Sequence, residues 1–300
     1  MTVDISRLKP YRMAVSDNRR WADFEPRPDD IFVCTPAKCG TTWTQTIIAN
    51  LLWPDGKFPA QIMMMSPWIE AEFMPADAMH AMLRAQTHRR FMKTHTAADG
   101  IPFFDDAKYV FVARDGRDAF MSMCNHMARM KPEFVGALNA RASEDGIPEM
   151  PPWTGDVHGF FHGWLDMAAH IEHVQSFWAL RDRSNLLFVH YNDLKSDLGG
   201  EMRRIAKFLD ITVPEPLWPS AAARCTFESM RAQEAEIGSF DAFAGGIKGF
   251  IFQGTNGRWR DVLTAEELSI YRRRVAEILP ADGAAWMEHG RAKLVGAANP

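Results

Sequence analysis

The stretch TPAKCGTTW at residues 35–43 is the most informative part of this chain. It follows the apolar run IFVC at 31–34, which is typical of a buried strand, and precedes residues 44–52, whose apolar positions recur at helical spacing. A strand, a small-residue loop and a helix start form an anion cradle, because free N–H groups and the positive end of the helix dipole face the same point. Gly40 allows close approach of the backbone, and Lys38 adds a point charge. The stretch therefore predicts a phosphate or sulfate site.

The position of the lysine argues against a nucleoside triphosphatase. The loop of those enzymes reads GxxxxGK followed by Ser or Thr, whereas Lys38 comes two residues before Gly40. A lysine ahead of the turn would approach the anion from a different side. The alternative interpretation is a solvated strand–helix turn with an incidental lysine, because short motifs produce false matches.

The loop resembles the 5′-phosphosulfate loop of the sulfotransferases that use 3′-phosphoadenosine 5′-phosphosulfate (PAPS), in their cytosolic-type, bacterial-like form. That loop usually reads PKSGTTW, whereas this chain reads PAKCGTTW, with one inserted residue after the proline and a cysteine in place of serine. The resemblance implies that the loop holds the 5′ end of the donor. The residues it assigns to donor binding here are Lys38, Cys39, Gly40, Thr41, Thr42 and Trp43.

A second segment, FMKTH at 91–95, resembles the family's KTH element, in which the histidine is the catalytic base. An acceptor hydroxyl must lose its proton as it attacks sulfur, and an imidazole with a pKa of roughly 6.5 suits that task. The resemblance implies that His95 is the base, that Lys93 steadies the transferring group, and that Lys38 stabilises the leaving oxygen. The alternative for His95 is a histidine that ends a strand and bonds a nearby carbonyl.

A third segment, KYVFVARDGRDAFMSMCNH at 108–126, predicts a buried strand over 109–113 and a helix from Arg117 onward. Arg114 ends the strand, and Ser122 lies eight residues later. In the family this pair holds the 3′-phosphate of PAPS, and a guanidinium fork with a hydroxyl suits a phosphate. The alternative is a surface pair between the arginine and a neighbouring aspartate.

The fourth segment, 173–209, resembles the family's long helix, a strand ending in a Tyr-x-Asp-Leu-Lys turn, and a further helix. The strand is predicted at 186–189 and the helix at 199–209. The resemblance implies that Tyr191 lies near the adenine, although a buried tyrosine bonding a carbonyl is an equal alternative. The sequence CTFESM at 225–230 aligns with the family's TSFKEM, which implies that Phe227 stacks near the base and that Cys225 replaces a contacting threonine.

The last matching segment departs from the family, which has Arg-Lys-Gly before a Gly-x-Trp element. Here the three residues are Phe252, Gln253 and Gly254, followed by TNGRWRD at 255–261. The glycines Gly254 and Gly257 are retained, but both cations are missing. We expect Arg258 to compensate in part, while Arg260 is an alternative cation and both arginines could instead be solvated.

Strands alternate with helical patterns along the chain, which predicts an α/β fold: a single domain with a central parallel sheet flanked by helices. Residues 29–300 are predicted to form the sulfotransferase domain, and residues 1–28 an N-terminal extension. The proline-rich stretch at 149–153 is typical of a loop between helices. Ligands of such sheets bind at the carboxyl ends of the strands, where the loop, His95 and Arg114 all fall.

The composition of the chain limits the classes of partner that we expect it to bind. The net charge of −4 gives no basic field for nucleic acid, and no stretch approaches the ~20 apolar residues of a membrane span. The four cysteines lack CxxC spacing and predict free thiols in a reducing compartment, and the N-terminus lacks the apolar core of a signal peptide. We therefore expect a cytoplasmic protein that acts on a small molecule; its oligomeric state stays open.

Two other functions remain as alternatives, a phosphotransferase with a P-loop-like site and a catalytically silent nucleotide-binding module. His158 and His162 lie four residues apart, as zinc ligands do on a helix, but no HExxH motif or cysteine pair accompanies them, so no metal is expected. The Met- and aromatic-rich segment 61–74 could line an apolar acceptor pocket or be plain core. The preferred acceptor is a small apolar molecule with a hydroxyl, or an amine, whose identity the sequence does not give.

Overall fold

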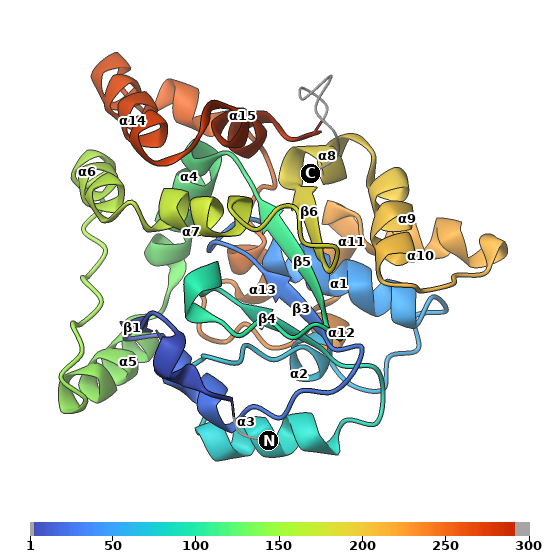
Figure 1. The fold of residues 1–300 in the computed structure, drawn as a ribbon. Coiled ribbons are helices and arrows are strands. Elements are labelled where there is room, and N and C mark those ends of the chain that lie inside the picture. The colour runs from blue at the N-terminus through green and yellow to red at the C-terminus, as the bar shows by residue number, and fades with distance from the viewer. Residues whose placement is uncertain (1–2, 292–300) are drawn as a thin grey trace.

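The computed structural model describes residues 3–291. A four-stranded sheet with the order β4-β3-β5-β6 lies at its centre, and every pair in it is parallel (Figure 1). The strands are β3 (Ile31–Cys34), β4 (Phe91–Thr94), β5 (Lys108–Ala113) and β6 (Leu186–His190), and a separate two-stranded ribbon pairs β1 (Arg12–Met13) with β2 (Ser16–Asp17). The predicted single-domain α/β fold with a parallel sheet is confirmed.

Helices surround this sheet. They are α1 (Thr41–Leu52), α2 (Ile62–Met65), α3 (Ala76–Ala85), α4 (Gly116–Arg129), α5 (Pro132–Glu144), α6 (Val157–Met167), α7 (Ala169–Trp178), α8 (Tyr191–Ser196), α9 (Leu198–Phe208), α10 (Trp218–Arg224), α11 (Phe227–Ala232), α12 (Glu234–Ile237), α13 (Gly246–Phe250), α14 (Ala265–Ile278) and α15 (Ala281–His289). Short 3₁₀ turns include η5 at Arg258–Asp261. Predicted boundaries agree to within about a residue, which is the usual uncertainty of helix ends, and residues 149–153 lie in the loop between α5 and α6.

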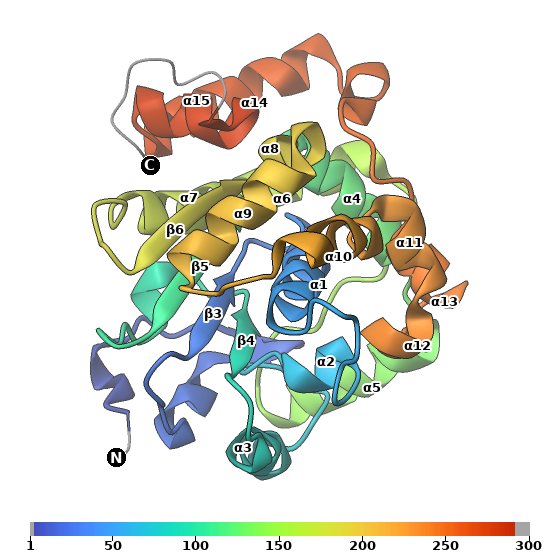
Figure 2. The same cartoon turned by 90° about the vertical axis from the view of Figure 1, so that its right-hand side faces the viewer.

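Both faces of the sheet are apolar and are covered by helices. Most aromatic side chains of the strands lie on one face and most aliphatic side chains on the other. The face formed by Phe32, Phe111 and Phe188 packs with aromatic residues of α7 and α15. The opposite face, which includes Val33 and Val110, packs with α1 and α9. Figures 1 and 2 show α7 and α1 on opposite sides of the strands. This continuous apolar character is what a parallel sheet covered on both faces requires.

All four strands point the same way, so their carboxyl ends meet at one edge of the sheet. The 35–40 loop follows β3, His95 follows β4, Arg114 follows β5, and Tyr191 follows β6. The parallel register aligns these ends, with Val33 opposite both Lys93 and Val110. Residues far apart in the sequence are therefore gathered at the edge where ligands of such sheets bind.

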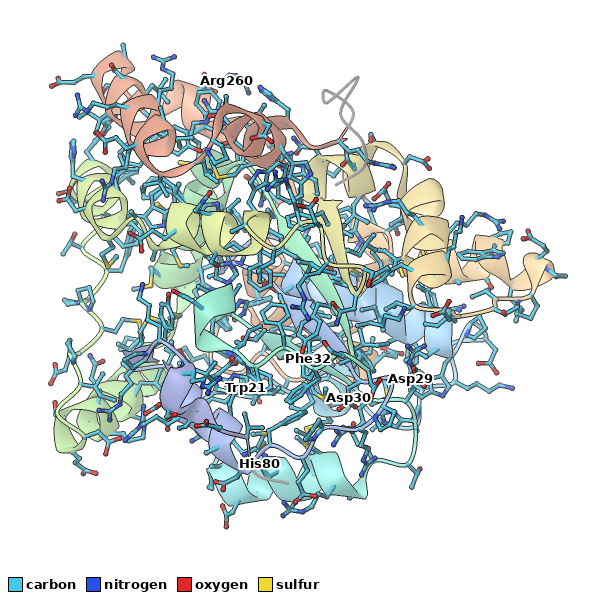
Figure 3. All side chains as sticks on the ribbon, viewed as in Figure 1. Trp21, Asp29, Asp30, Phe32, His80 and Arg260 are labelled. Atoms are coloured by element: carbon cyan, nitrogen blue, oxygen red, sulfur yellow. The ribbon has the colours of Figure 1, made fainter. Side chains whose placement is uncertain are left out.

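The N-terminal residues that the structure describes pack against the sheet. Trp21 is fully buried and its ring lies 5.6 Å from that of Phe32, as Figure 3 illustrates. Its indole Nε1 donates to Glu70 Oε1 at 2.9 Å. Phe24 completes the same aromatic cluster, 5.7 Å from Phe32. Burial of such rings contributes roughly 1.5–3 kcal/mol each, so this segment helps to hold the core together.

The four cysteines predicted as free thiols are free and all buried: Cys34, Cys39, Cys124 and Cys225. Burial raises the pKa of Cys39, Cys124 and Cys225 to about 12, because a thiolate is poorly solvated in the interior. Within residues 3–291, no helix is long and apolar enough to cross a membrane.

Candidate functional site

The loop after β3 takes a conformation that brings its backbone to the start of α1. Lys38 has a φ of +70° and Gly40 a φ of +104°, both in the left-handed region. Gly40 also lies so close to Tyr191 that an added Cβ would be 3.1 Å from its ring. A left-handed φ at a lysine costs of order 1–2 kcal/mol, which suggests that the loop is shaped for binding rather than for stability.

The first residues of α1 present donors at this loop. Gly40 is the N-cap and makes no side-chain cap bond, so the first amides of the helix are available for an anion. The hydroxyl of Thr41 lies 2.6 Å from that of Thr35, and Thr42 is buried beside it. Residues 39–42 thus lie at an uncapped helix start, and Thr41 is already engaged in a hydrogen bond.

His95 is oriented by the first residue of the loop, Thr35. Its Nδ1 lies 2.9 Å from the carbonyl oxygen of Thr35, which can only accept, so Nδ1 carries the proton and Nε2 has a free lone pair. The ring also meets Trp68 edge-on at 4.8 Å. Burial lowers the pKa of His95 to about 3, and the charge of Lys93 adds to this effect. The histidine is thus neutral near pH 7, as a general base must be.

Two lysines lie close enough to His95 for their charges to lower its pKa. Burial lowers the pKa of Lys38 to about 7, helped by the charges of Arg114 and Lys93, and burial lowers the pKa of Lys93 to about 8. The ammonium of Lys38 lies 4.3 Å from the centre of the Phe250 ring. A group of cations with depressed pKa values indicates a site built to receive negative charge.

Arg114 joins the strand ends to a distant segment of the chain. Its Nη2 donates to Thr255 O at 3.0 Å and to Asn256 Oδ1 at 2.6 Å, and its guanidinium stacks on Tyr191 at 4.1 Å. Among residues 3–291 its buried Nε has no partner, which leaves a donor for a ligand. Ser122 lies on α4 and is partly exposed.

The segment that lacks the family's two cations packs along α4. Gly257 N donates to Asp118 Oδ1 at 2.6 Å, which places Arg258 beside α4. The guanidinium of Arg258 lies 5.8 Å from the Phe252 ring, and that of Arg129 lies 4.3 Å from the same ring. Arg258 therefore lies beside α4 and close to the ring of Phe252. Arg260 packs on Trp259 at 4.5 Å and is exposed (Figure 3).

The residues assigned to the adenine fall into two groups. Trp43 meets Tyr191 edge-on at 5.2 Å, and its indole Nε1 donates to Cys225 O at 2.8 Å. The thiol of Cys225 points into the core, where it donates to Thr46 O. Only the backbone of Cys225 thus shares in this cluster.

Phe227 belongs to the second group. It begins α11 and lies against Gly254, where an added Cβ would be 2.6 Å from the Phe227 ring. Gly254 is therefore required by a close approach, with a φ of +63°. The ring of Phe227 is partly exposed, and the guanidinium of Arg231 lies 5.4 Å from its centre.

Three residues of the site escaped the sequence analysis. Thr35 orients His95, His126 Nδ1 lies 3.2 Å from the Lys38 ammonium, and Phe250 lies under that ammonium. Thr35 begins the quoted loop and could have been noticed there. His126 lies four residues after Ser122 on α4, which a helical-face argument could have found.

His158 and His162 form a separate cluster on α6. His158 Nδ1 lies 2.9 Å from Glu267 Oε1, and His162 Nε2 lies 3.9 Å from the same atom. They border a cavity of about 290 Å³ between α6 and α14. Among residues 3–291, no group of three His, Cys, Asp or Glu side chains could hold a metal ion.

Comparison with known proteins identifies the family of this chain. Residues 28–280 match the family model described as the sulfotransferase domain. The chain is 30% identical to a glycolipid sulfotransferase of Mycobacterium bovis over 94% of each chain. It is 27% identical to human sulfotransferase 1C2, over 84% of this chain and 85% of that one. The chain belongs to the sulfotransferase family, and the predicted sulfotransferase activity is confirmed.

Solved structures share the fold. Mouse sulfotransferase SULT7A1 in complex with PAP superimposes with a TM-score of 0.67 at 21% identity, covering 88% of each chain. Retinol dehydratase in complex with retinol and PAP gives a TM-score of 0.65 at 22% identity, covering 89% of this chain and 87% of that one. At these identities the likeness establishes the architecture, and the roles of individual residues rest on the geometry above.

Proposed function

We propose that this enzyme transfers the sulfuryl group of PAPS to the hydroxyl, or the amine, of a small apolar acceptor. The observation that carries the proposal is the convergence of Lys38, Lys93 and His95 at the strand ends, beside the uncapped start of α1. This arrangement provides fixed positive charge and one neutral base at a single point. The named relatives and the PAP-bound neighbours support PAPS as the donor.

The residues present fit such a donor. The first amides of α1 suit its 5′-phosphosulfate, and the unpartnered Nε of Arg114, with the Ser122 hydroxyl, suits its 3′-phosphate. Arg258 supplies further positive charge on the 3′ side. Tyr191 and Phe227 are proposed to lie near the adenine, and PAPS when bound supplies the activated sulfuryl group.

The chemistry assigned to the protein is proton removal and charge stabilisation. His95 takes the acceptor proton on Nε2 as the acceptor oxygen bonds to sulfur and the bond from sulfur to the 5′-phosphate oxygen breaks. Lys38 stabilises the electron pair left on that oxygen, and Lys93 steadies the transferring group. The negative charge of the donor opposes the effect of the lysines, so it raises the low pKa of His95 towards a useful value.

The acceptor is proposed to be apolar because aromatic rings lead from His95 to the surface. Trp68 lies 4.8 Å from His95, Phe73 lies 5.9 Å from Trp68, and Phe134 lies 6.3 Å from Phe73. Phe73 is 54% exposed, so this row of rings reaches the surface. Two structures of retinol dehydratase, one in complex with retinol and one with androsterone, support this class of acceptor.

Two measurements test the proposal. Calorimetric titration with 3′,5′-bisphosphoadenosine, adenosine 5′-phosphate and Mg-ATP should rank the bisphosphate tightest, because it alone engages Arg114. Transfer from labelled PAPS to a library of hydroxyl compounds should then give a labelled product. Preference for Mg-ATP would favour a phosphotransferase, and tight bisphosphate binding with no transfer to any compound would favour a silent binding module.

A further inference from the structure

His126 lies inside the candidate active site without a role in the reaction described above. It lies on α4 one turn after Ser122, and its ring lies 4.8 Å from Phe243 and 5.7 Å from Phe250. Burial lowers the pKa of His126, and the positive charges of Lys38 and Lys93 lower it further. The ring is therefore neutral near pH 7. Its Nδ1 lies 3.2 Å from the Lys38 ammonium.

The two histidines of the site carry their protons on opposite nitrogens. In its ammonium form Lys38 can only donate, so Nδ1 of His126 then accepts and the proton of His126 lies on Nε2. The carbonyl of Thr35 can only accept, so the proton of His95 lies on Nδ1. One histidine therefore offers a free lone pair as a base, whereas the other uses its Nδ1 lone pair to hold a lysine.

We propose that His126 is a positioning residue for sulfuryl transfer, which holds Lys38 as an ammonium ion at the place where the leaving oxygen develops charge. This inference rests on the proposed function, in which Lys38 acts on that oxygen. His126 acts through the lysine and is not assigned a contact with the substrate.

The surroundings of Lys38 explain why such a partner is needed. Among residues 3–291, Lys38 forms no ion pair with a carboxylate, and the charges of Arg114 at the end of β5 and of Lys93 on β4 both lower its pKa. Burial raises the pKa of the neighbouring Cys39, so its thiol stays neutral. Burial lowers the pKa of His95, so its ring is neutral as well. The Phe250 ring face and the lone pair of His126 are thus the contacts that favour the charged form.

Two substitutions separate the lone pair from the bulk of the ring. His126→Asn keeps an acceptor, Oδ1, near the position of Nδ1, whereas His126→Phe keeps the ring and removes the acceptor. Loss of a hydrogen bond to a charged group is worth about 10- to 150-fold. We expect kcat of His126→Phe to fall within that range with KM for the acceptor little changed, and His126→Asn to stay within about threefold of the parent. His162→Phe on α6 is the matched control and should match the parent.

The pH profile gives a second readout. The lone pair of His126 stabilises the ammonium, so its removal lowers the pKa of Lys38 further. The alkaline limb of kcat against pH should therefore move to lower pH in His126→Phe and stay in place in His126→Asn. Equal behaviour of the two variants, or an unchanged rate and profile in His126→Phe, would overturn the proposal.

A third readout does not depend on activity. Long-range ¹H–¹⁵N correlation spectra of the histidine-labelled protein distinguish the two imidazole tautomers. We expect His126 to carry its proton on Nε2 and His95 on Nδ1, with the ¹⁵N shift of His126 Nδ1 changed by Lys38→Met. The reverse tautomer at His126 would refute the inference whether or not transfer from PAPS is observed. Absence of transfer by the parent protein would instead refute the proposed function.

Discussion

The loop at 35–43 and the segment at 252–258 border the same site but are built differently. The loop follows directly from a strand, and its donors come from its own backbone and from the helix it begins. The segment depends on partners more than 100 residues away: Arg114 donates to Thr255 O, and Asp118 accepts from Gly257 N. A site formed by one continuous segment can therefore be predicted from the sequence, whereas a site formed by segments distant in the sequence requires the structure.

The contrast also suggests a division of labour. The lysine and the base lie on the loop side, where charge changes during the reaction, whereas the segment adjoins Arg114 and the 3′ side of the donor. Substitutions on the loop side should mainly lower the rate, and substitutions near the segment should mainly lower affinity for the donor. The following variants test that division, starting with the largest effect.

His95→Ala should lower the turnover rate by about 10²–10⁴-fold, because a general base typically contributes a rate factor of that size. Affinity for 3′,5′-bisphosphoadenosine should stay close to that of the parent, since His95 contacts Thr35 and Trp68 rather than the proposed nucleotide site. Single-turnover kinetics and calorimetric titration measure the two quantities. A loss of turnover below about tenfold would move the base to another residue.

Lys38→Ala should lower kcat by about 10²–10³-fold, the usual effect of removing one preorganised donor from a developing charge. Affinity for the donor should fall less. Lys38→Arg should restore little, because a planar guanidinium does not fit between Phe250 and His126 where an ammonium does. Full recovery of kcat with arginine would contradict the assigned position of the lysine.

Arg114→Gln should mainly weaken binding of the 3′-phosphate. Loss of a charge-assisted hydrogen bond costs about 1.5–3 kcal/mol, so the preference for the bisphosphate over adenosine 5′-phosphate should shrink by about 10- to 150-fold. Paired titrations of both nucleotides cancel any general loosening of the fold, because adenosine 5′-phosphate serves as the internal control. An unchanged preference would separate Arg114 from the 3′-phosphate.

The smallest effects are expected within the segment itself. Phe252→Arg with Gln253→Lys should tighten binding of the bisphosphate by about 1 kcal/mol per useful contact, unless Arg258 already fills the role. In that case Arg258→Ala should weaken binding, with exposed Arg260→Ala as the matched control. Titration of the four proteins decides between these outcomes, and equal affinities throughout would mean that the segment does not touch the 3′-phosphate.

The sequence predicted the sheet, its flanking helices and the strand ends that carry Lys38, His95 and Arg114, because these depend on local periodicity and on motif order. It did not predict that the guanidinium of Arg114 would stack on Tyr191 and donate hydrogen bonds to Thr255 O and Asn256 Oδ1. Those contacts arise only when β5, β6 and the segment before η5 come together. It also missed His126. The position of His126 one turn after Ser122 was visible in the sequence, but its contact with Lys38 arises only when the loop and α4 come together.

The four buried thiols give this enzyme a built-in probe of its own opening. Thiol reagents need both access and a thiolate, and the intact fold supplies little of either at Cys39, Cys124 or Cys225. Labelling should therefore proceed only as fast as the protein exposes each cysteine. A variant that retains Cys39 alone would report the opening of the phosphate loop directly, and the slowing of its labelling by a nucleotide would measure how firmly that nucleotide closes the loop.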